Sequence, residues 1–413
     1  MGQVKASEAF TVVAEGSITT PKGFKAGGLH CGLKKTDRHD LGAIVCEVPA
    51  AAAGVYTLNQ FQAAPIKVTQ DSIGTEGKLR AVIVNSGNAN AVTGKQGEAD
   101  AFEMRSRFAE RIGVPAAHVA VASTGVIGEL LKMDKVRGGI DALPEKLDGS
   151  REGADGFCQA ILTTDLVQKS VCVAVEIDGR TIHIAGAAKG SGMIHPNMAT
   201  MLGFVTTDAA IGSEALQGVL RQATDMTFNM ITVDGDTSTN DMLVAMASGL
   251  AGNKELTAAH PDWAKFADAF RYVCEVLAKA IARDGEGATK LVEVRIRGAE
   301  SVEAARAIAK TVIGSSLVKS AMFGADANWG RIIAAVGRSG QPVNVDTVDV
   351  RIGDIATLEQ SRPVPFDEDA ALAYLKGDTV VIDVDLHMGE SEAVAWGCDL
   401  TYDYVRINAA YRT

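Results

Sequence analysis

Short runs rich in valine, isoleucine and alanine recur along the first half of the chain, and several are apolar at every position. A run of this kind is apolar on both faces, which is typical of a strand in the interior of a covered sheet. The pattern favours an α/β protein. The predicted strands lie at 42–48, 81–85, 119–123, 170–177 and 181–186.

Helical spacing is clearest from Trp263 to Ile281, where apolar side chains recur at steps of three and four residues. Pro261 near the start and Gly285 just beyond the end are typical of helix boundaries. The segment therefore predicts an amphipathic helix that packs on a sheet. Further helices are predicted at 97–111, 213–226, 302–313 and 367–375.

The pattern changes at about residue 286. A helix is followed there by VNVDTVDVRI and TVVIDVDLHM, which alternate apolar and polar residues as strands with one solvated face do. We therefore predict a larger unit over residues 1–285 and a smaller α+β domain over residues 286–413. No low-complexity linker marks the boundary.

Charge and composition restrict the kinds of partner. The net charge of -11 without a Lys/Arg-rich run argues against binding of nucleic acid or an anionic membrane, so a small ligand is expected. No signal-peptide core is present, and no apolar run approaches the roughly 18 residues of a membrane helix. These features predict a soluble chain without a membrane anchor.

The six cysteines are scattered without a CxxC pair, and several have apolar neighbours. Buried free thiols are therefore expected rather than disulfides or metal ligands, which fits a cytoplasmic location. No cluster of Cys, His and carboxylates has the spacing of a metal site. Asp234, Asp236 and Asp241 in VDGDTSTND resemble a calcium loop only in part, because Ala245 stands at the closing position, so a polar turn is predicted.

The segment KGSGMIHPNMATML, residues 189–202, places one hydroxyl between a glycine-containing loop and an apolar strand. Its glycines and proline disfavour regular structure, whereas residues 201–205 predict the start of a buried strand. Thr200 lies at the junction, directly after the small Ala199. A threonine at a strand start often packs only a methyl group, and that interpretation requires no chemistry.

The same junction is also suited to self-cleavage. A cut between Ala199 and Thr200 would give fragments 1–199 and 200–413 and place the Thr200 hydroxyl beside a free α-amine. That amine has an ordinary pKa of about 7.7 to 8.0 and can act as the base that a hydroxyl nucleophile needs. Thr200 would then carry both the nucleophile and the base, and His195 is not needed as a base.

The segment KGSGMIHPNMATML is similar to the self-cleavage and catalytic motif of the ornithine acetyltransferase family, the glutamate N-acetyltransferases of the cyclic arginine pathway. The resemblance extends along nearly the whole chain, in blocks that follow the family's order. These blocks are TLNQFQAAP at 57–65, NSGNANA at 85–91, STGVIG at 123–128, GEGATK at 285–290 and MFGADANWGRI at 322–332.

The resemblance implies a four-layer αββα sandwich of the N-terminal-nucleophile type, with the catalytic core in residues 1–285 and a pocket completed by the smaller α+β domain. It implies that Thr200 takes acetyl from N2-acetyl-L-ornithine and passes it to L-glutamate in a ping-pong reaction without a cofactor. It leaves open whether acetyl-CoA is also a co-substrate. The two fragments are expected to pair and to assemble as a heterotetramer.

The resemblance also assigns roles to single residues. The Thr124 hydroxyl and the Gly125 N–H would hold the oxyanion, and glycine suits that position because its amide can point inward without a side-chain clash. Lys189 can pair with a carboxylate and Glu286 with an ammonium group. The residues implied in substrate binding are Thr163, Lys189, Thr200, Glu286, Asn408 and Thr413.

Other interpretations of the residues remain open. Taken alone, STGVIG is a strand that ends in a glycine turn, and Lys189 and Glu286 are ordinary surface charges. An N-terminal-nucleophile aminopeptidase or amidase would share the Thr200 chemistry but use water to resolve the acyl-enzyme. An uncleaved amino-acid-binding protein would retain the fold without that chemistry.

Overall fold

The computed structural model describes residues 9–195 and 201–409, and everything below refers to these residues. One sheet holds nine strands, of which β3 is the longest. They are β1 (Phe10–Val12), β2 (Phe24–Leu29), β3 (Leu41–Tyr56), β4 (Lys78–Asn88), β5 (Val119–Val126), β6 (Lys169–Ile177), β7 (Arg180–Lys189), β8 (Leu202–Thr207) and β10 (Met242–Ala247).

A second sheet has seven strands in the order β14-β13-β12-β15-β11-β16-β9. Their bounds are β9 (Ile231–Thr232), β11 (Leu291–Ala299), β12 (Asp349–Ile352), β13 (Ile355–Glu359), β14 (Arg362–Pro363), β15 (Thr379–Asp385) and β16 (Ser391–Cys398). β9 precedes residue 285, so this sheet takes one short strand from the first part of the chain. The predicted boundary near residue 285 stays a prediction.

The described α-helices are distributed along the whole chain. They are α1 (Ala64–Glu76), α2 (Gly94–Ile112), α3 (Met133–Ala142), α4 (Arg151–Ile161), α5 (Ser213–Met226), α6 (Trp263–Arg283), α7 (Val302–Ile313), α8 (Ser316–Phe323), α9 (Trp329–Gly337), α10 (Glu368–Leu375) and α11 (Tyr402–Ala409). None of them is both long and apolar enough to cross a membrane.

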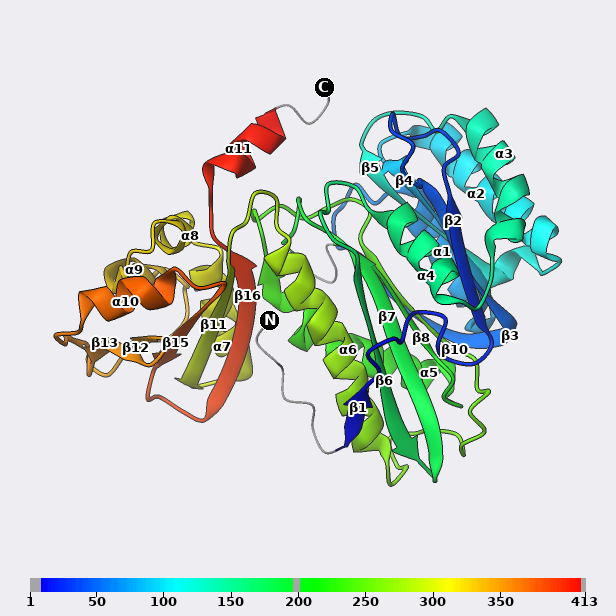
Figure 1. Cartoon of the computed structure of the whole chain (residues 1–413). Helices are drawn as coiled ribbons and strands as arrows, with labels where there is room; N and C mark the ends of the chain where they lie inside the picture. The colour runs from blue at the N-terminus through cyan, green and yellow to red at the C-terminus, as the bar shows by residue number, and fades with distance from the viewer. Residues whose placement is uncertain (1–8, 196–200, 410–413) are drawn as a thin grey trace.

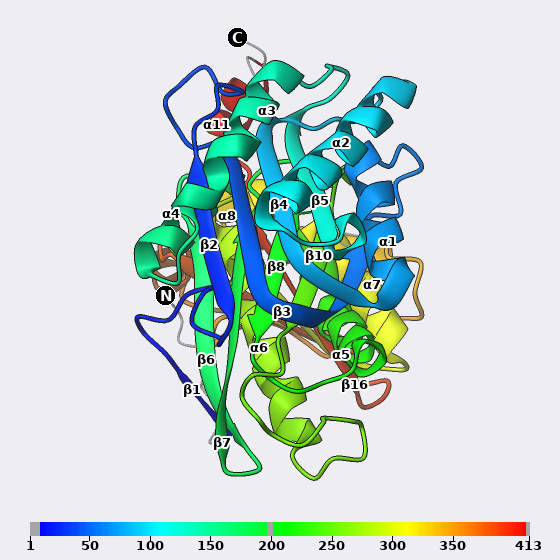
Figure 2. The ribbon, with the colours of Figure 1, turned by 90° about the vertical axis from the view of Figure 1, so that its right-hand side faces the viewer.

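The nine-stranded sheet forms two layers because β3 takes part in both. The first half of β3 pairs with β2 and β4, and its second half pairs with β10, with an irregular register against β4 between Val45 and Ala50. Val82 of β4 and Phe204 of β8 belong to one buried apolar cluster, so the two layers pack face to face. Figure 2 shows β3 running from the first layer into the second.

Helices cover the outer face of each layer. Phe108 of α2 packs with Ile83 of β4 in a second apolar cluster, together with side chains of α1 and α3. On the opposite side, Phe270 of α6 and Leu220 of α5 belong to the apolar cluster that includes β6, β7, β8 and β10. Figure 1 shows α6 along these strands, with the second sheet beyond it. The molecule thus has the four-layer αββα architecture that the family resemblance implies.

The predicted elements are largely confirmed. The helix expected over 263–281 is α6, and those expected at 213–226 and 302–313 are α5 and α7. The five predicted strands are present, but β3 continues to Tyr56 instead of ending at 48. Within VNVDTVDVRI, only Asp349–Ile352 forms a strand. All six cysteines are free thiols and five of them are buried, as predicted.

Candidate active site

A cavity of about 260 Å³ lies where β5, β7 and β8 meet the loop before β10 and the helix α11. It is lined by all of the predicted site residues that the structure describes. These are Thr124, Gly125, Thr163, Lys189, Glu286 and Asn408. Ala199, Thr200 and Thr413 lie outside the described residues, but Met201, which follows Thr200 in the chain, also lines the cavity. The fold therefore brings together residues that are far apart in the sequence.

Thr124 and Gly125 lie near the end of β5, where its pairing with β4 becomes irregular at Asn88. Gly125 has φ +135°, and a Cβ there would lie 2.4 Å from the carbonyl carbon of Gly87. Only glycine fits this approach without displacing the neighbouring backbone. The irregularity in the ladder is typical of strands that direct a group toward a functional site.

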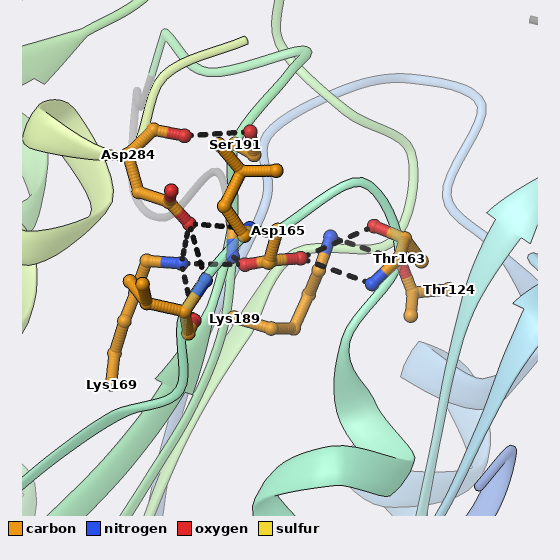
Figure 3. Close-up of polar contacts among 10 residues, drawn as sticks. Thr124, Thr163, Asp165, Lys169, Lys189, Ser191 and Asp284 are labelled. Carbon is orange, nitrogen blue, oxygen red and sulfur yellow. Dashed lines mark hydrogen bonds and ion pairs between the residues drawn. The ribbon is translucent and has the colours of Figure 1, made fainter. Parts of the chain in front are cut away.

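Lys189 is the last residue of β7, and it is 7% exposed. Its Nζ lies 3.5 Å from Thr124 Oγ1 (Figure 3), so the cation lies beside the hydroxyl expected to hold an oxyanion. A buried ammonium group of this kind can pair with a carboxylate of a bound ligand. Glu286 lies in the same cavity and supplies the opposite charge.

A buried ion-pair network supports this part of the cavity. Lys169 Nζ lies 2.7 Å from Asp165 Oδ1 and 2.6 Å from Asp284 Oδ2, and its side chain is fully buried. Asp165 also accepts hydrogen bonds from the backbone N–H of Gly190 at 2.7 Å and of Thr163 at 3.0 Å. Figure 3 shows this network beside Lys189. It fixes the loop of Thr163 and the end of β7 relative to each other.

The charge on Asp165 is stabilised by its surroundings. Burial alone would raise the pKa of its carboxyl group, but the positive charges of Lys189 and Lys169 and the backbone hydrogen bonds hold that pKa well below its ordinary value. Asp165 therefore stays ionised near neutral pH and balances two buried cations.

Glu286 is positioned by two hydrogen bonds, and a third bond holds Ser191, its backbone partner. Its backbone N–H donates to the carbonyl of Ser191 at 3.0 Å, and the Ser191 hydroxyl donates to the carbonyl of Asp284 at 2.7 Å. Asn408 Nδ2 donates to Glu286 Oε2 at 2.8 Å, which joins α11 to the cavity. A Cβ on Gly192 would lie 2.3 Å from the Glu286 carboxyl carbon, so a larger residue there would displace the Glu286 carboxylate.

Asp234 and His195 make contacts with the neighbouring backbone and side chains. Asp234 accepts backbone hydrogen bonds from Met193 at 2.6 Å and Ile194 at 2.9 Å, and thus fixes the loop before the junction. No group of three or more Cys, His and carboxylate side chains in the described part of the chain could hold a metal ion. His195 Nδ1 lies 3.0 Å from Thr232 Oγ1, and burial together with Lys310 lowers the pKa of His195 to about 4.

Sequence reasoning missed four residues around the cavity. Asp165, Lys169 and Asp284 build the supporting network, and Asp241, which was assigned to a polar turn, lines the cavity with 4% of its surface exposed. One available signal was the position of Asp241 directly before the six apolar residues of β10. A carboxyl group in a cleft whose pKa is strongly raised is a candidate functional residue.

Comparison with known proteins identifies the family. The ArgJ family model matches residues 25–413. The arginine biosynthesis bifunctional protein ArgJ of Geobacillus kaustophilus (strain HTA426) is 60% identical over 413 residues, covering 100% of both chains. The protein of that name from Halalkalibacterium halodurans is 61% identical over 399 residues, covering 96% of both chains.

Among solved structures, the arginine biosynthesis bifunctional protein argJ from Bacillus halodurans is 61% identical, with a TM-score of 0.50. The match covers 98% of that chain but 50% of the present one, so the solved chain is about half as long. The matches to the family model and to the curated relatives extend over nearly the whole sequence. The chain therefore belongs to the ArgJ family.

Proposed function

We propose that this enzyme transfers the acetyl group of N2-acetyl-L-ornithine to L-glutamate in arginine biosynthesis. The observation that carries the proposal is one cavity that holds a cation, an anion and two candidate oxyanion donors beside Met201. An acetylated amino acid presents a carboxylate, and ornithine adds an ammonium group. Lys189 can pair with the carboxylate, and Glu286 can pair with the ammonium group. The names of the curated relatives support a role in arginine biosynthesis.

The first step of the proposal is self-cleavage between Ala199 and Thr200. The Thr200 hydroxyl attacks the Ala199 carbonyl, the peptide bond becomes an ester, and water hydrolyses that ester. The half-length chain of the solved relative supports processing, because a chain cut near its middle gives pieces of that size. The new α-amine of Thr200 then acts as a base.

Acetyl transfer follows in two displacements. The Thr200 oxygen attacks the acetyl carbonyl, the amide bond breaks, and ornithine leaves with a proton on its nitrogen. The α-amine of glutamate then attacks the acetyl-threonine ester and regenerates the hydroxyl. Each attack forms an oxyanion, which the Thr124 hydroxyl and the Gly125 N–H stabilise. A preorganised donor of this kind contributes about 3 kcal/mol.

Product analysis tests this function. Incubation with N2-acetyl-L-ornithine and L-glutamate is expected to yield N-acetylglutamate and ornithine, measured by mass spectrometry. If acetate forms without N-acetylglutamate, the enzyme is an aminopeptidase or amidase and not a transferase. Thr200→Ala should abolish both cleavage and transfer, whereas Thr200→Ser should retain part of each. A fully active Thr200→Ala variant would show that Thr200 is not the nucleophile.

Two finer parts of the proposal have separate tests. The relatives are named bifunctional, which supports acetyl-CoA as a second acetyl donor, and an assay with acetyl-CoA and glutamate tests it. We also propose that two copies of each fragment form a heterotetramer. Native mass spectrometry would measure that assembly, and denaturing mass spectrometry should show two fragments instead of one 43.1 kDa species.

A further inference from the structure

The proposed self-cleavage requires a group that moves protons before any free α-amine exists. In the uncut chain the nitrogen of Thr200 belongs to a peptide bond, and an amide nitrogen is not a base. The Thr200 hydroxyl must nevertheless lose a proton, and the departing nitrogen must gain one. The base invoked for acetyl transfer is therefore a product of the cut and cannot promote it.

Asp241 lies in the cavity with one carboxyl oxygen unused. Its Oδ2 is buried and has no hydrogen-bond partner among the described residues, although most buried polar atoms do have one. The residue is 4% exposed and is part of the cavity wall. An unsatisfied oxygen at this place is available to a reacting group.

The backbone around Asp241 is held firmly. Asn240 Nδ2 donates to the carbonyls of Ala89 and, at 2.9 Å, Ser123, and the carbonyl of Asp241 accepts from the N–H of Thr57 at 3.0 Å. These bonds tie the loop before β10 to β5 and to the residues that directly follow β3 and β4. The Asp241 carboxyl group is therefore placed by rigid elements, as a catalytic group must be.

Strand pairing places Asp241 beside Met201, the first described residue that follows the proposed cut in the chain. β10 and β8 are parallel, and Met242 is paired with Leu202. The N–H of Met242 donates to the carbonyl of Met201 at 3.0 Å, so the residue before Met242 lies alongside Met201. Met201 is joined by its peptide bond to Thr200, the residue that is expected to attack.

The surroundings favour the protonated form of the Asp241 carboxyl group. Burial raises the pKa of Asp241 well above its ordinary value, and the opposing effects of Ser238 and Lys189 are smaller. A neutral carboxyl group has one oxygen that accepts a hydrogen bond and one O–H that donates. It can therefore take a proton on one oxygen while it releases another.

We propose that Asp241 is the proton-transferring residue of self-cleavage, an inference that rests on the self-cleavage step of the proposed function. As the Thr200 oxygen bonds to the Ala199 carbonyl carbon, the hydroxyl proton passes to the free carboxyl oxygen of Asp241, and in the same step the proton already on the carboxyl group passes to the Thr200 nitrogen, so Asp241 stays neutral. The carbon–nitrogen bond of the tetrahedral intermediate then breaks as the carbonyl re-forms. The nitrogen leaves as a neutral amine and Asp241 is again protonated. Water then hydrolyses the ester.

Asp241→Asn tests this inference in the full chain, because asparagine keeps the size and neutrality of the carboxylic acid but cannot transfer its protons. Cell-free synthesis gives a defined starting time, and denaturing gels follow the loss of the 43.1 kDa species. We expect cleavage about 100-fold slower than in the wild type. Asp241→Glu should cut faster than Asp241→Asn because it restores the carboxyl group.

Two controls accompany these variants. Asp236→Asn makes the same change at an exposed position of the same loop and should cut at the wild-type rate. The uncut Thr200→Ala precursor is the reference for folding, and Asp241→Asn should unfold within about 2 °C of it.

Wild-type cleavage in Asp241→Asn would overturn the inference, and so would equal rates in Asp241→Asn and Asp241→Glu. A large loss of stability in Asp241→Asn would also overturn it, because slow cutting would then be a folding defect. A wild-type chain that is not cut would instead refute the proposed self-cleavage. Cutting without formation of N-acetylglutamate would refute the proposed transfer alone.

Discussion

Replacing Lys169 with methionine should destabilise the protein strongly, because the lysine is the cation between two buried carboxyl groups. Its Nζ lies 2.7 Å from Asp165 and 2.6 Å from Asp284, and its side chain is fully buried. Methionine fills a similar volume without a charge, so both buried carboxyl groups lose the cation between them, although Asp165 keeps the charge of Lys189 and two backbone N–H donors. Removal of one member of such a pair costs about 3 to 5 kcal/mol.

This cost can be converted into a temperature shift. Unfolding entropy is about 2.1 cal/mol/K per residue, so the Lys169→Met variant should unfold about 4 to 6 °C below the wild type. Calorimetry at equal protein concentration measures the shift. Lys25→Met removes an exposed cation that lies 3.2 Å from Glu47, and should change the midpoint by about 1 °C or less.

The loss should also depend on pH. The pKa of Asp165 is held below its ordinary value, so this residue stabilises the wild type above the unfolded pKa of about 3.9. That contribution is lost as the pH falls through the lower, folded pKa. In the variant, protonation of the two carboxyl groups that have lost Lys169 removes their buried charge at low pH. The difference in unfolding temperature between the two proteins should therefore be about 4 to 6 °C at pH 7 and smaller near pH 4. A difference below 1 °C, or one that is unchanged between these pH values, would refute this reasoning.

Two further variants test the cavity itself. Glu286→Gln removes the anion expected to pair with the ornithine ammonium group, and should raise KM for N2-acetyl-L-ornithine about 10- to 100-fold with a smaller change in kcat, measured from initial rates. Gly125→Ala would place a Cβ 2.4 Å from Gly87 and displace a candidate oxyanion donor, so kcat should fall about 100-fold in the same assay. Gly128→Ala, also at positive φ but facing open space, should keep kcat near the wild-type value.

Much of the fold could be predicted because local signals agree with tertiary packing. α7 begins where Ser301 accepts a hydrogen bond from the N–H of Ala304, and the predicted bounds 302–313 match this cap. β3 was predicted too short because its second half, Ala50 to Tyr56, is rich in alanine and glycine and has weak strand propensity. Burial between two layers, which sequence patterns do not reveal, keeps this part extended.

The candidate site was predictable only in part. Resemblance to a family selected Thr163 and Asn408, which lie 245 positions apart in sequence numbering yet line one cavity, and no local pattern could pair them. Lys169 looked like an ordinary polar residue because its burial depends on the packing of β6 against α6. Asp241 looked like part of a polar turn until the register of β8 and β10 placed it beside Met201. The roles of Thr200 and Thr413 stay predictions.

The position of β8 has a practical consequence. β8 is buried along its whole length and is hydrogen-bonded to β7 on one side and β10 on the other, while β10 is bonded to β3. A break before β8 would thus leave β8 and β10 of the second polypeptide hydrogen-bonded between β7 and β3 of the first. They should migrate together through gel filtration and separate only in detergent or denaturant, so a preparation that looks homogeneous under native conditions can still consist of two polypeptides.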